Sequence, residues 1–160
     1  MYNRMIKGMI VFSLSLSALM AQVGPKLQIE IEDRKVNLSD TEQKGGPINY
    51  APGDTIEYTV ISKNVGDALM TEPVITDPIP AGVTYLQDTA TDDDAELQYS
   101  IDGGNVFSTW PVYYTVRNAK GVIIRREATA NMVTHIRWII QKNLEAGESH
   151  EAKFQVVVNP

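Results

Sequence analysis

Turn-forming residues and alternating residues interleave through residues 50–85, and this stretch restricts the fold more than any other part of the sequence. Pro52 and Gly53 indicate a turn, because proline presets φ at its first corner and glycine tolerates positive φ at the second. In residues 54–60, apolar and polar side chains alternate, which predicts a strand with one buried face. Proline and glycine in residues 78–82 interrupt the ladder before another short strand. Strands separated by such turns are typical of an all-β sandwich.

The later part of the chain continues this pattern. Asn64-Val-Gly66 ends the first strand of the stretch, and Asp102-Gly-Gly104 predicts a hairpin whose return strand begins at Val106 and Phe107. No long window keeps a helical period, so any helix should be short. About nine strands at hairpin-like spacing predict two packed antiparallel sheets. Besides that return strand, the predicted strands lie in residues 27–31, 54–60, 83–85, 97–101, 112–116, 122–126, 134–140 and 152–158.

Four large side chains form the predicted core. Tyr58, Ile136, Trp138 and Phe154 each occupy the apolar phase of an alternating run. Side chains in one phase point to one face of their strand, so we expect these four to meet between the two sheets.

The first 21 residues have the pattern of a secretory signal peptide. Arg4 and Lys7 supply a positive n-region, and residues 9–19 form an apolar stretch that is too short to span a bilayer readily. We expect cleavage after Ala21 and no stable membrane insertion afterwards; an uncleaved anchor is the alternative. The chain then divides into a signal peptide (1–21), an N-terminal strand and linker (22–49) and a β-sandwich domain (50–160).

Charge and cysteine content narrow the function classes. The net charge of the 160 residues is −6, and the part after residue 21 has 12 basic and 20 acidic residues, or −8. Nucleic acids and anionic lipid surfaces attract basic patches, so neither is an expected partner. The chain has no cysteine, which excludes an acylated lipoprotein cysteine and thiol catalysis. It also excludes disulfides, so stability must come from the core.

Several motifs in the domain carry a resemblance to a known family. The chain resembles the bacterial and archaeal surface repeats catalogued as domain of unknown function eleven, over about residues 48–159. The resemblance implies an immunoglobulin-like β-sandwich in secreted or cell-surface proteins, and it implies no catalytic motif. Relatives often carry the unit in tandem, whereas this chain has one copy. The matching motifs are Pro-Gly-Asp-Thr-x-x-Tyr-Thr-Val at 52–60, Asn-x-Gly at 64–66, and the runs at 76–85, 99–104, 134–138 and 144–149.

The titratable side chains show no catalytic arrangement. His135 lies on the outward side of its strand and His150 in a turn, and we expect both to be exposed and without partners. Two histidines without cysteine do not by themselves fill a zinc site. Catalysis needs a nucleophile beside a base, or paired carboxylates in a cleft. We therefore expect no enzyme activity and no cofactor. Tyr113 is outward by phase, and one exposed ring does not make a glycan-stacking platform.

Calcium and an internal isopeptide bond are two further hypotheses. Asp92, Asp93 and Asp94 are weak calcium candidates, because the ion accepts several carboxylate oxygens but their spacing is not that of a calcium-binding loop. A mobile, hydrated loop is the alternative. An isopeptide bond needs a buried lysine, and the phases of Lys63 and Lys153 point away from the core.

Leu27, Ile29 and Ile31 are the candidate interface residues. They alternate with polar residues as in a strand, and the polar residues 39–49 separate them from the domain motifs. Such a linker extends to about 36 Å, so the strand can reach its own sheet or the open edge of a neighbour. Both pairings remain open at this point.

These features favour a secreted, non-enzymatic structural or interaction protein of the prokaryotic cell surface. We expect a subunit or accessory of a filament, envelope layer or matrix, with protein partners or self-assembly through exposed strand edges. The alternative is a soluble extracellular binding module for a glycan or calcium.

Overall fold

The computed structural model of the chain describes residues 24–36 and 48–160, and these residues form an all-β structure with antiparallel pairing. The all-β architecture predicted from the alternating pattern is therefore confirmed. The expected signal peptide and most of the expected linker lie outside the described residues. The strands are β1 (Leu27–Lys35), β2 (Thr55–Asn64), β3 (Val74–Pro78), β4 (Val83–Tyr85), β5 (Ala95–Ser100), β6 (Tyr113–Arg117), β7 (Ile123–Glu127), β8 (His135–Ile140) and β9 (Ser149–Val158).

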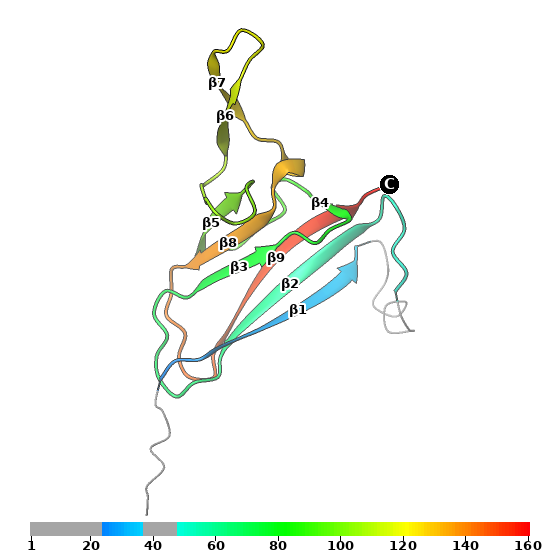
Figure 1. The fold of residues 1–160 in the computed structure, drawn as a ribbon. Helices are drawn as coiled ribbons and strands as arrows, with labels where there is room; N and C mark the ends of the chain where they lie inside the picture. The colour runs from blue at the N-terminus through cyan, green and yellow to red at the C-terminus, as the bar shows by residue number, and fades with distance from the viewer. Residues whose placement is uncertain (1–23, 37–47) are drawn as a thin grey trace, which may run out of the picture.

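The described strands form two larger sheets and one separate hairpin (Figure 1). One sheet has the order β1-β2-β9-β4, the other has the order β3-β8-β5, and among the described strands β6 pairs with β7 alone. The single helical element in the described part of the chain is a 3-10 turn, Ala130–Met132. Within that part, no helix has the length and apolar character needed to cross a membrane.

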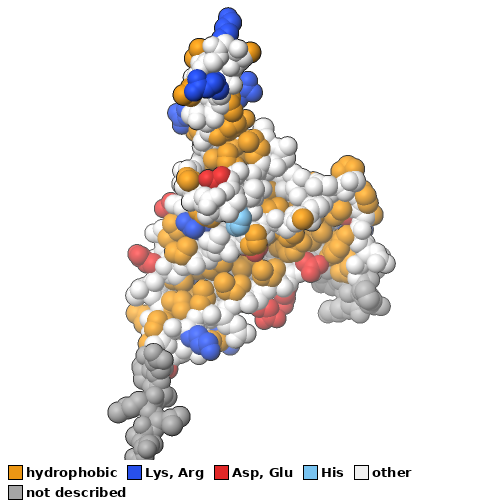
Figure 2. All heavy atoms as spheres, viewed as in Figure 1, with side chains coloured by type: hydrophobic (Ala, Val, Ile, Leu, Met, Phe, Trp, Pro, Cys, Tyr) orange, Lys and Arg blue, Asp and Glu red, His pale blue; other side chains and the backbone are white. Residues whose placement is uncertain are grey.

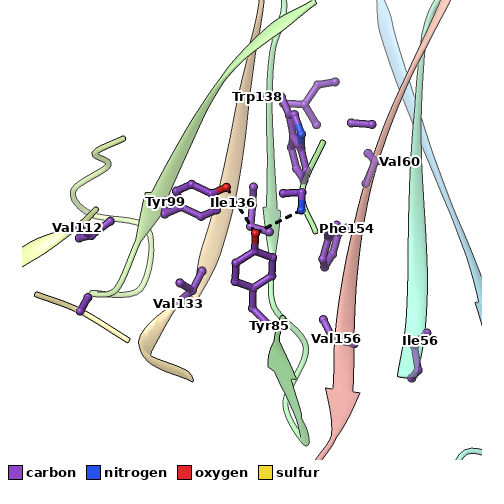
Figure 3. Close-up of a cluster of buried hydrophobic side chains, with 14 of the residues drawn as sticks. Ile56, Val60, Tyr85, Tyr99, Val112, Val133, Ile136, Trp138, Phe154 and Val156 are labelled. Carbon is purple, nitrogen blue, oxygen red and sulfur yellow. Dashed lines mark hydrogen bonds between the residues drawn. The ribbon is translucent and has the colours of Figure 1, made fainter. Parts of the chain in front are cut away.

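The two larger sheets share one core. Ile136 and Trp138 from β8 and Phe154 from β9 are fully buried, while Tyr58 from β2 is partly buried against them. The Phe154 ring lies 5.2 Å from the Tyr58 ring and 5.9 Å from the Trp138 ring, measured between centroids. Figure 3 shows Trp138 and Phe154 reaching toward each other from opposite sheets. Burial of such aromatic side chains is the main favourable term in the stability of a fold without disulfides.

Two buried tyrosines close the side of this core nearest β5. The hydroxyls of Tyr85 and Tyr99 lie 3.5 Å apart, and the Tyr85 hydroxyl also accepts a hydrogen bond of 3.3 Å from the backbone N–H of Ala90 (Figure 3). Both phenol groups thus have a partner, as buried polar groups require. Burial is the largest cause that raises the pKa of Tyr99.

The loop after β5 differs from the expected hairpin. The predicted return strand at Val106 and Phe107 does not form, and the chain meets β5 again only at Ser108, through two hydrogen bonds with Tyr99. The cause is local, because the Asp102 carboxylate accepts the backbone N–H groups of Asn105 and Val106 at 3.1 and 3.0 Å. Side-chain capture of backbone donors competes with strand pairing in this way.

The hairpin β6–β7 departs from the expectation that all strands belong to two packed sheets. The two strands predicted for this region do form, but they make a two-stranded sheet of their own. In Figure 1 this hairpin projects away from the larger sheets. Each strand has five residues, and Tyr114 is the one residue of the two strands that packs against the core of the described chain.

Candidate functional site

The face of β1 that should belong to the core is uncovered. Cross-strand pairing places Ile29 opposite Ser62 and Ile31 opposite Val60, and the two β2 residues are fully buried. Directly opposite residues share one face of a sheet, so both isoleucines are on the core side. Yet their exposed fractions are 47% and 49%. Among the described strands, the sheet that contains β1 has four strands, and the sheet packed against it has three, so one edge strand is left uncovered. Tyr85 on β4, the other edge strand, is buried, so the uncovered edge strand is β1.

The edge of β1 is also open. Among the described residues, β1 pairs with β2 over its whole length of nine residues and with no other strand. The backbone N–H and C=O groups on its far side therefore have no strand partner among the described residues. Charged Glu30, Glu32 and Arg34 occupy the opposite face from Ile29 and Ile31. Charged side chains are a usual protection of an edge strand against unwanted pairing.

Ion pairs hold the C-terminal end of β1 against its own chain. The Lys35 ammonium lies 2.5 Å from the Asp54 carboxylate, and Arg34 donates a hydrogen bond of 2.8 Å to Glu57. The hydrogen bond from Lys35 is the largest cause that lowers the pKa of Asp54. Of the two pairings left open by the sequence, the structure shows the intramolecular one. Leu27, at the other end, is partly buried against the core.

The N-terminal end of β1 depends on one buried amide. The Asn64 side chain donates hydrogen bonds to the carbonyls of Ala68 and Leu144, at 2.8 and 2.9 Å. Its oxygen accepts the backbone N–H groups of Gly66 and Lys26, at 3.1 and 3.3 Å. Three chain segments, at Lys26, residues 64–68 and Leu144, thus meet at a fully buried side chain. The sequence indicated this Asn-x-Gly as the end of a strand and as one motif of the resemblance, but it did not predict the contacts of the Asn64 side chain.

His150 contradicts its sequence prediction. Its Nε2 lies 2.6 Å from the Asp92 carboxylate, and the two side chains are only 4% and 3% exposed. The residue is the second of β9 rather than part of a turn, and it has the same inward phase as Ala152 and Phe154. Extending the alternation of residues 152–158 back by one step would have found this burial.

The calcium candidates are divided between different partners. Asp92 faces His150, Asp94 lies 3.2 Å from the Lys142 ammonium, and Asp93 is exposed. In the described ranges, no group of three or more His, Cys, Asp or Glu side chains is placed to hold a metal ion. An open pocket of about 360 Å³ lies here, lined by Thr91, Asp92, Asp93, Asp94, Lys142, Ser149, His150 and Glu151.

Of the remaining candidates, His135 is half-buried and the others are exposed. His135 is half-buried, and its Nδ1 lies 3.1 Å from the hydroxyl of the preceding threonine, so the expectation of an exposed, unpartnered ring is wrong here too. Lys63 and Lys153 are exposed, which agrees with their predicted phase. Tyr113 is 44% exposed, and the Arg125 guanidinium covers one face of its ring at 3.7 Å from the centroid.

Asp77 on β3 leads to a pH-dependent prediction. Its side chain is buried without a hydrogen bond or ion pair to any described residue, and burial raises its pKa from 3.8 to about 6. At pH values between these two, Asp77 is protonated in the folded state and ionised in the unfolded state. The free energy of unfolding therefore decreases as the pH rises through this window. We expect Asp77→Asn to have a free energy of unfolding about 1–3 kcal/mol higher than the wild type at neutral pH, and the same as the wild type near pH 4.

Urea unfolding of both proteins at the two pH values measures this difference. Asp93→Asn is the matched control, because that carboxylate is exposed and should leave stability unchanged at either pH. An equal effect of Asp77→Asn at both pH values would contradict the assignment of the shift to burial.

Comparison of the chain with family models, with curated proteins and with solved structures found no match. Strand β1 combines two features along the same nine residues: an edge that pairs with no further described strand, and exposed apolar side chains on the core side.

Proposed function

We propose that this chain is a secreted or cell-surface, non-enzymatic structural protein with an immunoglobulin-like β-sandwich, which acts by association through exposed strand edges. The observation that carries the proposal is the state of β1. Its core-side residues Ile29 and Ile31 are half exposed, and its outer edge is unpaired among the described residues. An edge strand with an adjacent apolar face is a template for a partner strand or a second copy.

The motifs and the N-terminal pattern of the sequence support the same class of function. The motifs at 52–60, 64–66 and 76–85 resemble those of surface repeats, and the first 21 residues resemble a signal peptide. The His150–Asp92 pair is buried, and no hydroxyl of a described residue is hydrogen-bonded to either side chain. A filament subunit, an envelope-layer component or a matrix protein fits these features.

Size-exclusion chromatography with light scattering tests the proposal. The wild type should form concentration-dependent assemblies, and Ile29→Lys/Ile31→Lys should weaken them roughly tenfold or more, because two charges replace the exposed apolar contact. Val74→Lys is the matched control, since Val74 is 51% exposed on the outer face of β3. A wild type that stays monomeric at high concentration, and melts at a higher temperature with calcium or a glycan, would favour the binding module instead.

A further inference from the structure

Within the described chain, the hairpin β6–β7 packs against the core through Tyr114 alone. Its two strands pair over five positions, and neither pairs with another described strand. An isolated two-stranded hairpin is marginally stable in water. Near its tip, Val122 and Ile123 are 56% and 63% exposed. Figure 2 shows the projecting part with blue Lys and Arg side chains beside exposed apolar ones.

The two faces of this hairpin differ in chemistry. Tyr114 lies opposite Arg126 and Val116 lies opposite Ile124, so one face is mainly apolar. Its three apolar side chains are only partly buried. The other face is exposed and contains two of the arginines. That face consists of Tyr113, Thr115, Arg117, Ile123, Arg125 and Glu127.

The hairpin is basic in an acidic chain. Residues 113–127 contain four basic residues and one acidic residue, a net charge of +3, whereas the whole chain has −6, which leaves −9 on the remaining residues. No acidic side chain of the described residues forms an ion pair with these basic groups. The basic residues are Arg117, Lys120, Arg125 and Arg126.

The strand β1 has the complementary pair of faces. Ile29 and Ile31 are exposed on the core side, and Leu27 lies in line with them. Glu30 and Glu32 are exposed on the outer side and form no hydrogen bond or ion pair with a described residue. If the hairpin extended the sheet beyond β1, its apolar face would continue the isoleucines and its basic face would lie beside the glutamates. Same-face neighbours on adjacent strands stabilise a sheet in this way.

We propose that an open edge of the β6–β7 hairpin of one copy pairs with the β1 edge of a second copy. This proposal rests on the proposed structural function and names its partner, which is the chain itself. The hairpin points away from the sheet that contains β1 (Figure 1), so the contact joins two different molecules. Donor and acceptor are different surfaces, and a contact of this kind repeats head to tail and forms an open chain of subunits.

Charge exchange between two variants of the full protein tests this pairing. Arg117→Glu/Arg125→Glu reverses the hairpin, and Glu30→Lys/Glu32→Lys reverses β1. Each variant alone places like charges across the contact, so light scattering should show assembly weakened roughly tenfold or more. An equimolar mixture restores opposite charges at every contact and should assemble as the wild type does. Asp93→Lys/Glu96→Lys is the control for the β1 variant, because it also replaces two exposed acidic residues with lysine. It should assemble normally.

The outcomes separate this pairing from the broader function. If the wild type assembles and either variant alone still assembles equally well, or if the mixture does not recover, the hairpin–β1 pairing is overturned and the structural function stands. If the wild type itself is monomeric at high concentration, both fall. Recovery in the mixture, with normal assembly of the control, supports the pairing because only a contact between the two changed surfaces predicts it.

Discussion

Replacing Trp138 with alanine should destabilise the domain by about 3–5 kcal/mol, a large part of the stability of a typical domain. The side chain is fully buried on β8, and its ring packs 5.9 Å from Phe154 on the other sheet. Truncation leaves a cavity between two sheets whose backbone pairing prevents them from closing over it. Urea unfolding followed by circular dichroism measures the loss as a lower midpoint with an unchanged slope.

Trp138→Phe separates the packing effect from the polar one. Among the described residues, the indole N–H is buried without a hydrogen-bond partner. Phenylalanine keeps an aromatic ring and removes that donor, so its loss should be much smaller, about 1 kcal/mol. Equal losses for the alanine and phenylalanine variants, or no loss for alanine, would contradict the placement of this ring between the sheets.

Changing Asn64 to aspartate should cost about 3–5 kcal/mol at neutral pH, although the two side chains have nearly the same shape. The Asn64 amide nitrogen donates to the carbonyls of Ala68 and Leu144. A carboxylate cannot donate to them, and it would place a buried negative charge beside two carbonyl oxygens. Both the loop after β2 and the approach to β9 lose their anchor. Thermal and urea unfolding measure the loss, which should shrink at acidic pH as the new carboxyl group is protonated.

Asn118→Asp is the matched control for this substitution. Asn118 turns the chain between β6 and β7, and its side-chain oxygen accepts the backbone N–H groups of Lys120 and Val122 at 2.9 and 3.0 Å. Aspartate accepts both bonds equally well in this exposed turn, so stability should change by less than about 0.5 kcal/mol. Similar losses at the two positions would show that the Asn64 amide donor is not what holds its loops.

The alternation of apolar and polar residues was sufficient to predict which side chains of a single strand are buried. The phases of residues 54–60, 134–140 and 152–158 correspond to the alternating burial of β2, β8 and β9. His150 shows how the same rule fails at a boundary. The sequence placed it in a turn, although the inward phase of β9 already includes its position.

Contacts between distant residues were outside the reach of that reasoning. Asp92 meets His150 across 58 positions, and Asn64 meets Leu144 across 80. No local pattern encodes such pairs without the sheet order. The exposure of Ile29 and Ile31 likewise follows from the facing sheet having one strand fewer. Their alternation predicts a buried face, and only the arrangement of the sheets shows that nothing described covers it.

The order of the sheet with β1 also determines how the domain responds to force. Both β1 and β9 pair antiparallel with β2, so they run in the same direction, and the start of β1 and the end of β9 lie at opposite ends of the sheet (Figure 1). Tension between these two points acts along the strands and perpendicular to their hydrogen bonds. The nine paired positions of each ladder then bear the load together in shear, instead of opening one after another from an end.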